Sequence, residues 1–208
     1  MTLRCGLFGG TFNPVHAGHV VLATEVVEAL GLDRLVVVPA RRSPHKADEP
    51  SAPGPIRLAL LRAAFAGRAD VVVVDWELLR EGPSYTIDTL ADGRRAYPDA
   101  VWTLVLGADS VADFPRWRAA SEIAAAADLA IAVRPGAPDD VLGPLRAALP
   151  GIRARVVPTT PIGVSSTLVR ARAARGLPLR GYVPDAVAKA LEESGLYRAA
   201  SSATTEAP

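Results

Sequence analysis

Residues 3–19 read LRCGLFGGTFNPVHAGH, an apolar run followed by two glycines, a proline and a pair of histidines. The run Leu3–Phe8 has the length and composition of a buried strand, and a helical pattern begins after Pro14. Gly9 and Gly10 lack side chains, so the chain can turn sharply and bring its N–H groups close to a phosphate. The stretch therefore predicts a strand, a phosphate-binding turn and a helix whose positive N-terminal end favours an anion.

Short apolar runs alternate with helical patterns along the rest of the chain. Further strands are predicted at Leu35–Val38, Val71–Val74, Val101–Leu106, Leu129–Val133 and Ile152–Val157. Helices are predicted near residues 17–30, 56–67, 86–97, 119–127 and 139–149. The apolar runs are rich in β-branched residues and mostly lack alternation, as in strands covered on both faces. This order predicts an α/β fold, Rossmann-like, with a doubly wound and mainly parallel sheet.

The C-terminal part differs in pattern. Ser165–Arg175 and Pro184–Ser194 read as two helices with no strand after them, so residues 164–198 are expected to form a small helical part of a single domain spanning 1–198. Residues 199–208 are small and polar without periodicity, which predicts a disordered tail. The Pro-rich segment Ser43–Pro55 predicts a long mobile loop of the kind that closes over ligands in α/β enzymes.

Composition and charge restrict the class of protein. Half of the 208 residues are hydrophobic and the formal net charge is +1, which indicates a globular protein rather than a binder of nucleic-acid polymers or membrane surfaces. No run approaches the ~20 apolar residues of a membrane span, and the first run is too short for a signal peptide. The single cysteine, Cys5, excludes an intramolecular disulfide and reads as a buried hydrophobe. We therefore expect a soluble cytoplasmic protein; the sequence leaves a homo-oligomer open.

His16 and His19 stand three residues apart at a predicted helix start, so their side chains share one face. An imidazolium donates from both nitrogens and can stabilise charge on phosphate oxygens. A structural role is the alternative for either residue alone, but two of the chain's three histidines occur here, behind a double glycine. The turn is neither a Gly-x-Gly-x-x-Gly motif nor a P-loop.

A second phosphate-binding segment is predicted at residues 164–170, VSSTLVR. Ser165 or Ser166 can cap a helix whose exposed N–H groups and hydroxyls converge on an anion, and Arg170 can reach the same anion from one turn further on. Alone, the segment would read as an ordinary helix cap followed by a solvated arginine. Together with the histidine pair, it predicts a clamp on one triphosphate.

These two segments resemble the signatures of the HxGH nucleotidyltransferase superfamily, and the resemblance extends from Gly6 to Tyr197. It implies that His16 and His19 bind the phosphates of ATP and that His19 stabilises the transition state. An acceptor phosphate would attack the α-phosphorus and pyrophosphate would leave, with no protein nucleophile. Because no Asp, Glu and His cluster suggests a metal site in the protein, Mg²⁺ is expected to be carried mainly by the phosphates. The residues assigned to ATP are Gly9, Gly10, Phe12, His16, Gly18, His19, Gly107, Asp109, Ile162, Ser165, Ser166 and Arg170.

Further segments resemble the nicotinate mononucleotide adenylyltransferase branch of this superfamily. The resemblance implies that Trp117 stacks on the nicotinate ring and that backbone groups around Tyr85 and Thr86 bind the pyridine substrate. It adds Lys46 to His16, His19 and Arg170 as a catalytic residue. The residues assigned to the acceptor are Thr11, Asn13, Lys46, Tyr85, Thr86, Asp109, Trp117 and Arg134.

Several of these assignments have structural alternatives. Trp117 and Tyr85 could belong to the core, Asp109 could cap a helix, and Lys46 and Arg134 could be solvated cations. Asn13 stands where many members of the family have Asp, so a role that needs an anion is in doubt there. The closing segment 181–197 resembles the family's last helix and is expected to be structural.

The favoured function is adenylyl transfer from ATP to nicotinate mononucleotide, giving nicotinate adenine dinucleotide and pyrophosphate in NAD biosynthesis. Nicotinamide mononucleotide or phosphopantetheine as acceptor, or CTP as donor, would define another member of the superfamily. A catalytically silent nucleotide sensor is expected to lack at least one of His16, His19, Ser166 and Arg170, and all four are present. A nucleic-acid binder conflicts with the balanced charge.

Overall fold

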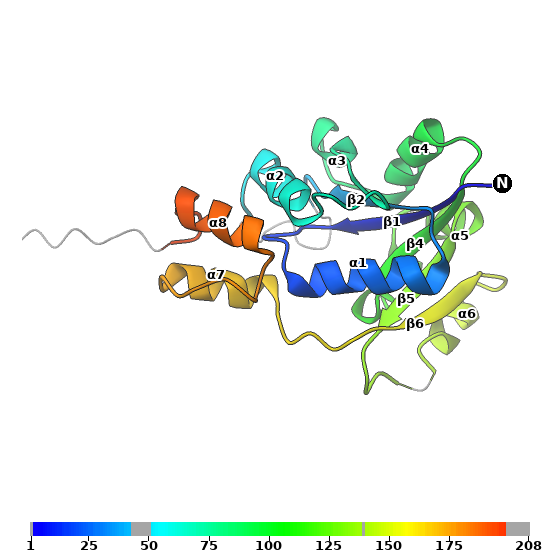
Figure 1. Ribbon diagram of the computed structural model, residues 1–208. Coiled ribbons are helices and arrows are strands. Elements are labelled where there is room, and N and C mark those ends of the chain that lie inside the picture. The colour runs from blue at the N-terminus through cyan, green and yellow to red at the C-terminus, as the bar shows by residue number, and fades with distance from the viewer. Residues whose placement is uncertain (1, 43–50, 139, 199–208) are drawn as a thin grey trace, which may run out of the picture.

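The computed structural model describes residues 2–42, 51–138 and 140–198. In this part of the chain, six parallel strands form one sheet in the order β3-β2-β1-β4-β5-β6 (Figure 1). The strands are β1 (Arg4–Gly10), β2 (Arg34–Pro39), β3 (Val71–Val73), β4 (Val101–Gly107), β5 (Asp128–Val133) and β6 (Ala154–Pro158). From β1 the strands continue outward through β2 to β3, and from β4 they continue on the other side through β5 to β6, which is the doubly wound order. The predicted fold class is confirmed.

Helices cover both faces of this sheet. Side chains of α1 (Ala17–Leu30) and α2 (Gly54–Ala64) pack on one face, whereas α4 (Thr86–Ala96), α5 (Ala120–Ala126) and α6 (Gly143–Ala148) pack on the other. The last two helices, α7 (Ser166–Ala174) and α8 (Asp185–Ser194), lie beyond the carboxyl ends of the strands (Figure 1). The loops that follow the strands therefore meet at the end of the molecule where α7 and α8 are placed.

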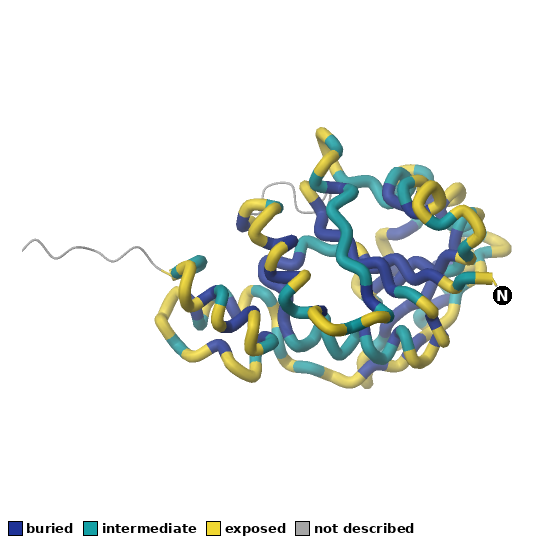
Figure 2. Tube along the Cα trace, turned by 45° about the horizontal axis from the view of Figure 1, so that its top comes forward, coloured by how far each residue is buried: buried dark blue, intermediate teal, exposed yellow. Residues whose placement is uncertain are grey.

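The hydrophobic core has two parts, one on each face of the sheet. In β2, Leu35 and Val37 belong to one part, while Val36 and Val38 belong to the other, because successive side chains of a strand point to opposite faces. Figure 2 shows the strands as the buried centre of the molecule, with exposed residues concentrated on helices and loops. This double coverage explains why the strands show no polar alternation, and it gives the loops a rigid support.

Each predicted strand and helix has a counterpart in the structure, with some differences. The short helix α3 (Trp76–Leu79) and the 3₁₀ turns at Ala108–Ser110 and Phe114–Arg116 were not predicted, since elements this short show no periodicity. The edge strand β6 is more open than expected, with Val156 41% exposed. Cys5 is buried and free, as predicted.

Two sequence predictions concern residues outside the described part of the chain. The expected disordered tail at 199–208 lies there, as do residues 43–50 of the predicted mobile loop. The end of that predicted loop differs from expectation, because α2 already begins at Gly54. No helix of the described residues is long and apolar enough to cross a membrane.

Candidate active site

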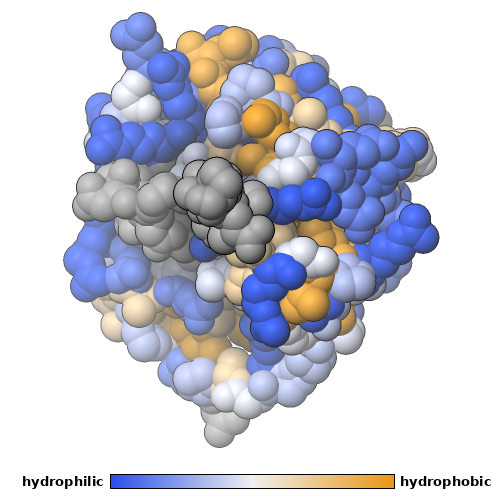
Figure 3. Space-filling view, turned by 90° about the vertical axis from the view of Figure 1, so that its left-hand side faces the viewer, coloured by the Kyte–Doolittle hydropathy of each residue, from blue (hydrophilic) through white to orange (hydrophobic). Residues whose placement is uncertain are grey.

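A cleft of about 580 Å³ opens where the central strands β1 and β4 end. It is lined by residues from three loops that the sequence assigned to nucleotide binding: Gly9, Gly10, Thr11, Tyr85, Thr86, Asp109 and Trp117. Figure 3 looks at the molecule from this end, where hydrophobic side chains show between mostly hydrophilic ones. The carboxyl ends of parallel strands at a switch point are the usual ligand site of such sheets, and five of the eight predicted acceptor residues line the cleft there: Thr11, Tyr85, Thr86, Asp109 and Trp117.

Trp117 forms an aromatic wall of the cleft. Its ring is half-buried and packs against fully buried Phe114, with ring centroids 5.3 Å apart. Tyr85 precedes the first residue of α4, and the guanidinium of Arg118 lies over its ring, 4.6 Å from the centroid. The cleft therefore offers a flat apolar surface beside a cation, which suits an anionic heterocycle.

A buried carboxyl group, Glu77, also lines the cleft. The Thr89 hydroxyl donates to Glu77 Oε1 over 2.6 Å, and Arg80 Nη2 donates to the Thr89 hydroxyl over 2.7 Å. Burial raises the pKa of Glu77, partly offset by hydrogen bonds from Thr89 and Ser84. Neither Glu77 nor Arg118 was predicted from the sequence, although a carboxylate within the apolar run Trp76–Leu79 was a signal for Glu77.

The two histidines stack at the start of α1. Their ring centroids are 3.7 Å apart with a tilt of 34°, and the His16 backbone N–H donates to His19 Nδ1 over 3.2 Å. Because Nδ1 of His19 accepts a hydrogen bond, a neutral His19 ring carries its proton on Nε2 and can donate from there. The pair thus provides a donor of defined tautomer at the end of β1.

Burial lowers the pKa of both histidines. It lowers the pKa of His16 to about 4, with a smaller contribution from the charge of Arg134. Burial, then His16, then Arg134 hold the pKa of His19 well below its ordinary value. Both rings are therefore neutral in the protein alone at neutral pH, whereas the sequence argument relied on imidazolium donors. The charge of Arg134 acts on both histidines, and Arg134 does not line the cleft.

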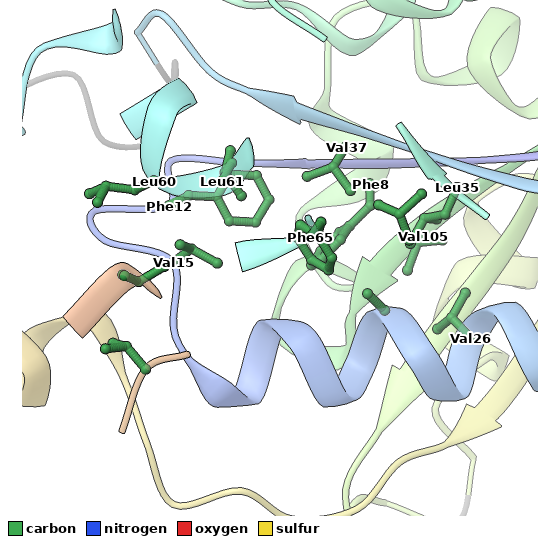
Figure 4. Close-up of a cluster of buried hydrophobic side chains, with 14 of the residues drawn as sticks. Phe8, Phe12, Val15, Val26, Leu35, Val37, Leu60, Leu61, Phe65 and Val105 are labelled. Carbon is green, nitrogen blue, oxygen red and sulfur yellow. The ribbon is translucent and has the colours of Figure 1, made fainter. Parts of the chain in front are cut away.

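The side chain of Phe12 is buried, and its assignment to ATP binding stays a prediction. Its side chain is 2% exposed and lies in the core beside Leu61 (Figure 4). Its ring packs edge-on against His19, with centroids 4.9 Å apart. Phe12 therefore links the core to the ring of His19.

The serine and arginine segment is attached directly to the histidine loop. Ser165 caps α7 by accepting the Leu168 N–H, and the Ser166 hydroxyl donates to the carbonyl of Pro14 over 2.8 Å. Arg170 Nη1 donates to the carbonyl of Asn13, also over 2.8 Å. The starts of α1 and α7, far apart in sequence, thus lie against each other, as a clamp formed by these two segments requires.

Gly18 allows this close approach. A Cβ atom at this position would lie 3.1 Å from Cε1 and Nδ1 of His16 and 3.5 Å from the carbonyl oxygen of Val164, the residue just before the α7 cap. The glycine of the His-x-Gly-His motif therefore leaves room for the first histidine ring.

The remaining predicted residues have diverse positions. Gly107 ends β4, and half-buried Ile162 lies between β6 and α7, in a segment that the Thr160 N–H fixes to Glu25 of α1 over 2.9 Å. Lys46 lies outside the described residues. Among the residues that are described, no three His, Cys, Asp or Glu side chains gather to hold a metal ion.

A histidine pair joined to a capped arginine helix at the switch point of a doubly wound sheet is the arrangement of a nucleotidyltransferase. In agreement, a family model described as cytidylyltransferase-like matches residues 7–172. A relative from Gemmatimonas aurantiaca, named probable nicotinate-nucleotide adenylyltransferase, is 40% identical over 200 residues, which cover 94% of this chain and 93% of the relative. A Thermus thermophilus relative of the same name is 39% identical over 198 residues, covering 94% and 100%. The chain belongs to the nicotinate-nucleotide adenylyltransferase family, as its motifs predicted.

A solved structure supports the fold. The Plasmodium falciparum nicotinic acid mononucleotide adenylyltransferase complexed with NaAD has a TM-score of 0.73 over 94% of this chain and 97% of its own. At 14% identity, this likeness concerns the fold alone.

Proposed function

We propose that this protein transfers the adenylyl group of ATP to nicotinate mononucleotide, giving nicotinate adenine dinucleotide and pyrophosphate in NAD biosynthesis. The observation that carries the proposal is the stacked pair His16 and His19 together with Arg170, which donates to the carbonyl of Asn13 in the loop just before the pair. The names of the relatives at about 40% identity indicate the same acceptor.

The reaction needs positioning and charge stabilisation. A phosphate oxygen of the acceptor attacks the α-phosphorus of ATP in line, the bond to the bridging oxygen of the β-phosphate breaks, and pyrophosphate leaves with that bonding pair. His19 Nε2–H donates to the oxygen on which charge develops, while His16, the backbone N–H of Ser166 at the start of α7, and Arg170 hold the remaining phosphate oxygens. No protein nucleophile takes part.

The cleft provides the acceptor site. Trp117 offers its ring to the pyridine, and the N-terminal end of α4 at Tyr85 and Thr86 presents backbone N–H groups to its carboxylate. Asp109 follows β4 and accepts from ribose hydroxyls. Thr11 and Asn13 in the glycine turn, with Lys46 and Arg134, complete the proposed acceptor set.

Mg²⁺ fits this site as a companion of ATP. The clamp is built from imidazoles, hydroxyls and a guanidinium, which bind phosphate oxygens, and Mg²⁺ prefers carboxylates, waters and phosphates. When bound, the ion neutralises part of the triphosphate charge. The partners are therefore small nucleotides; a cytoplasmic location and a homo-oligomer stay predictions.

Product formation tests the acceptor. The protein is incubated with ATP and Mg²⁺ and, in turn, nicotinate mononucleotide, nicotinamide mononucleotide and phosphopantetheine, with CTP as a donor control. The nucleotidylated acceptor and pyrophosphate are measured. We expect kcat/KM to be highest for nicotinate mononucleotide. Equal or better turnover of another acceptor would reassign the substrate, and no product with any acceptor would favour a silent nucleotide-binding protein.

Two substitutions at His19 test its role. His19→Gln keeps an N–H donor near the position of Nε2, whereas His19→Asn keeps only an acceptor near Nδ1. We expect kcat to fall roughly a hundredfold or more in His19→Asn and clearly less in His19→Gln. Similar losses in both variants would contradict donation from Nε2.

A further inference from the structure

Three polar side chains from distant parts of the chain meet behind the glycine turn: Arg57, Asn13 and Tyr197. We call them the buried brace. They come from α2, from the connection between β1 and α1, and from the segment after α8. Neither the proposed chemistry nor the sequence motifs give a role to Arg57 or Tyr197.

Arg57 is 1% exposed and is bonded to backbone carbonyls. Its Nε donates to Ala52 over 2.8 Å, its Nη1 to Thr11 over 2.7 Å and its Nη2 to Ala40 over 2.7 Å. Burial lowers the pKa of Arg57, so the low-polarity surroundings act against the charge. A buried guanidinium is retained only if its donors are satisfied, and here it fixes the turn after β1 to the chain after β2 and before α2.

Asn13 extends the same network. The Oδ1 atom of this buried residue accepts the N–H of Ala52 over 3.0 Å, so the Ala52 backbone is held on one side by Asn13 and on the other by Arg57. The same Oδ1 accepts the hydroxyl of Tyr197 over 2.6 Å. The Asn13 carbonyl meanwhile accepts from Arg170. A single residue thus connects the end of the chain to an arginine of the phosphate clamp.

Tyr197 can act as a permanent donor in this network. Burial raises the pKa of Tyr197 to about 12, although Arg170 and Arg57 oppose the rise. The hydroxyl therefore keeps its proton over the whole neutral range. It lies 184 positions along the chain from the residue that it contacts.

We propose that Tyr197, Asn13 and Arg57 are positioning residues for adenylyl transfer, and that the C-terminal segment thereby helps to orient Arg170 and the histidine loop. The inference rests on the proposed function. Asn13 stands three residues before His16, and its own carbonyl contacts Arg170, so a rotation of its peptide moves both halves of the clamp. The amide oxygen alone serves both donors, and no anion is needed at position 13 for this purpose.

Deletion of one hydroxyl tests the proposal. Tyr197→Phe removes the donor and keeps the ring, while Tyr182→Phe deletes a hydroxyl in the same C-terminal segment and serves as the matched control. We expect kcat of Tyr197→Phe to fall roughly tenfold with KM for ATP changed less than about threefold, because misplacement by a fraction of an ångström affects the transition state most. Tyr182→Phe should match the wild type. Unchanged kcat in Tyr197→Phe, or an equal loss in the control, would overturn the proposal.

Variants at Asn13 separate positioning from a general loss of stability. Asn13→Leu removes the acceptor for both donors and should lose at least as much kcat as Tyr197→Phe, whereas Asn13→Asp keeps an acceptor and should lose clearly less than Asn13→Leu. If the two residues act as one unit, Tyr197→Phe adds no further loss in the Asn13→Leu background. Multiplying losses would mean independent effects and refute the brace. A wild-type protein that makes no dinucleotide would instead refute the proposed function, so the two failures are distinguishable.

Discussion

Replacing Gly18 by alanine should separate stability from activity. Gly18 lies in the first turn of α1, between the two histidines, and its backbone conformation needs no glycine. Alanine is the better helix former by up to about 1 kcal/mol, so the free energy of unfolding should stay constant or rise slightly. The new Cβ, however, would lie 3.1 Å from two atoms of the His16 ring, which is closer than ordinary contact.

The size of the effect on activity follows from this contact. The His16 ring must move by a few tenths of an ångström to restore ordinary contact. Since a displacement of ~1 Å at a catalytic group can cost on the order of a hundredfold in rate, we expect kcat of Gly18→Ala to fall roughly fivefold to tenfold. Steady-state kinetics with ATP and nicotinate mononucleotide measure kcat, and denaturant unfolding measures stability.

Gly163→Ala is the matched control. It adds the same methyl group near the start of α7, where no heavy atom lies within 4 Å of the new Cβ, and it should leave kcat unchanged. Wild-type kcat in Gly18→Ala would refute the reasoning that the His16 ring must keep its place.

Three further results are expected. Burial lowers the pKa of His16 to about 4 from 6.5, so between pH 6.5 and pH 4 the unfolded chain binds a proton that the folded chain does not. Through this residue, the free energy of unfolding should fall by about 3 kcal/mol from pH 7 to pH 4. Denaturant titrations should show a shallower pH dependence for His16→Asn, and parallel curves would contradict the buried neutral ring. Trp117→Leu should raise KM for nicotinate mononucleotide roughly fivefold and leave KM for ATP unchanged, and a shift of the ATP value instead would place the ring elsewhere. Arg118→Gln should reduce the preference for nicotinate over nicotinamide mononucleotide, measured as a ratio of kcat/KM values, roughly tenfold, because it removes a cation from the cleft. The control is Arg116→Gln, since the guanidinium of Arg116 is already paired with Asp113. Equal ratios in the two variants would argue against a role of Arg118.

The fold, and the gathering of several candidate site residues at one cleft, could be predicted because their signals are local. Apolar runs such as Val101–Leu106 show no alternation since both faces of the strand are covered, and helical patterns lie between them. Residues that follow the ends of parallel strands, such as Thr11 and Asp109, must gather at one edge. The position of Thr11 and Asp109 after strand ends was therefore enough to predict that both line one cleft.

The buried brace could not be predicted in this way. Tyr197 meets Asn13 through the packing of α8 against α2, and nothing in the residues near either position encodes that contact. Arg57 left a weak signal, since an arginine stands on the apolar face of a helix together with Leu58 and Leu61. The burial of the Phe12 side chain in the core was likewise not predicted, and the assignment of Phe12 to ATP stays a prediction.

The contact of Tyr197 with Asn13 has a practical consequence for anyone who alters the end of this chain. A protein shortened by removal of everything after Leu196 would retain each described helix and strand, and its circular dichroism spectrum should look normal. It would nevertheless lack the hydroxyl that reaches the loop beside His16. Affinity tags and fusion partners are therefore better joined at the N-terminal end, where β1 begins on the side of the molecule away from α7 and α8 (Figure 1).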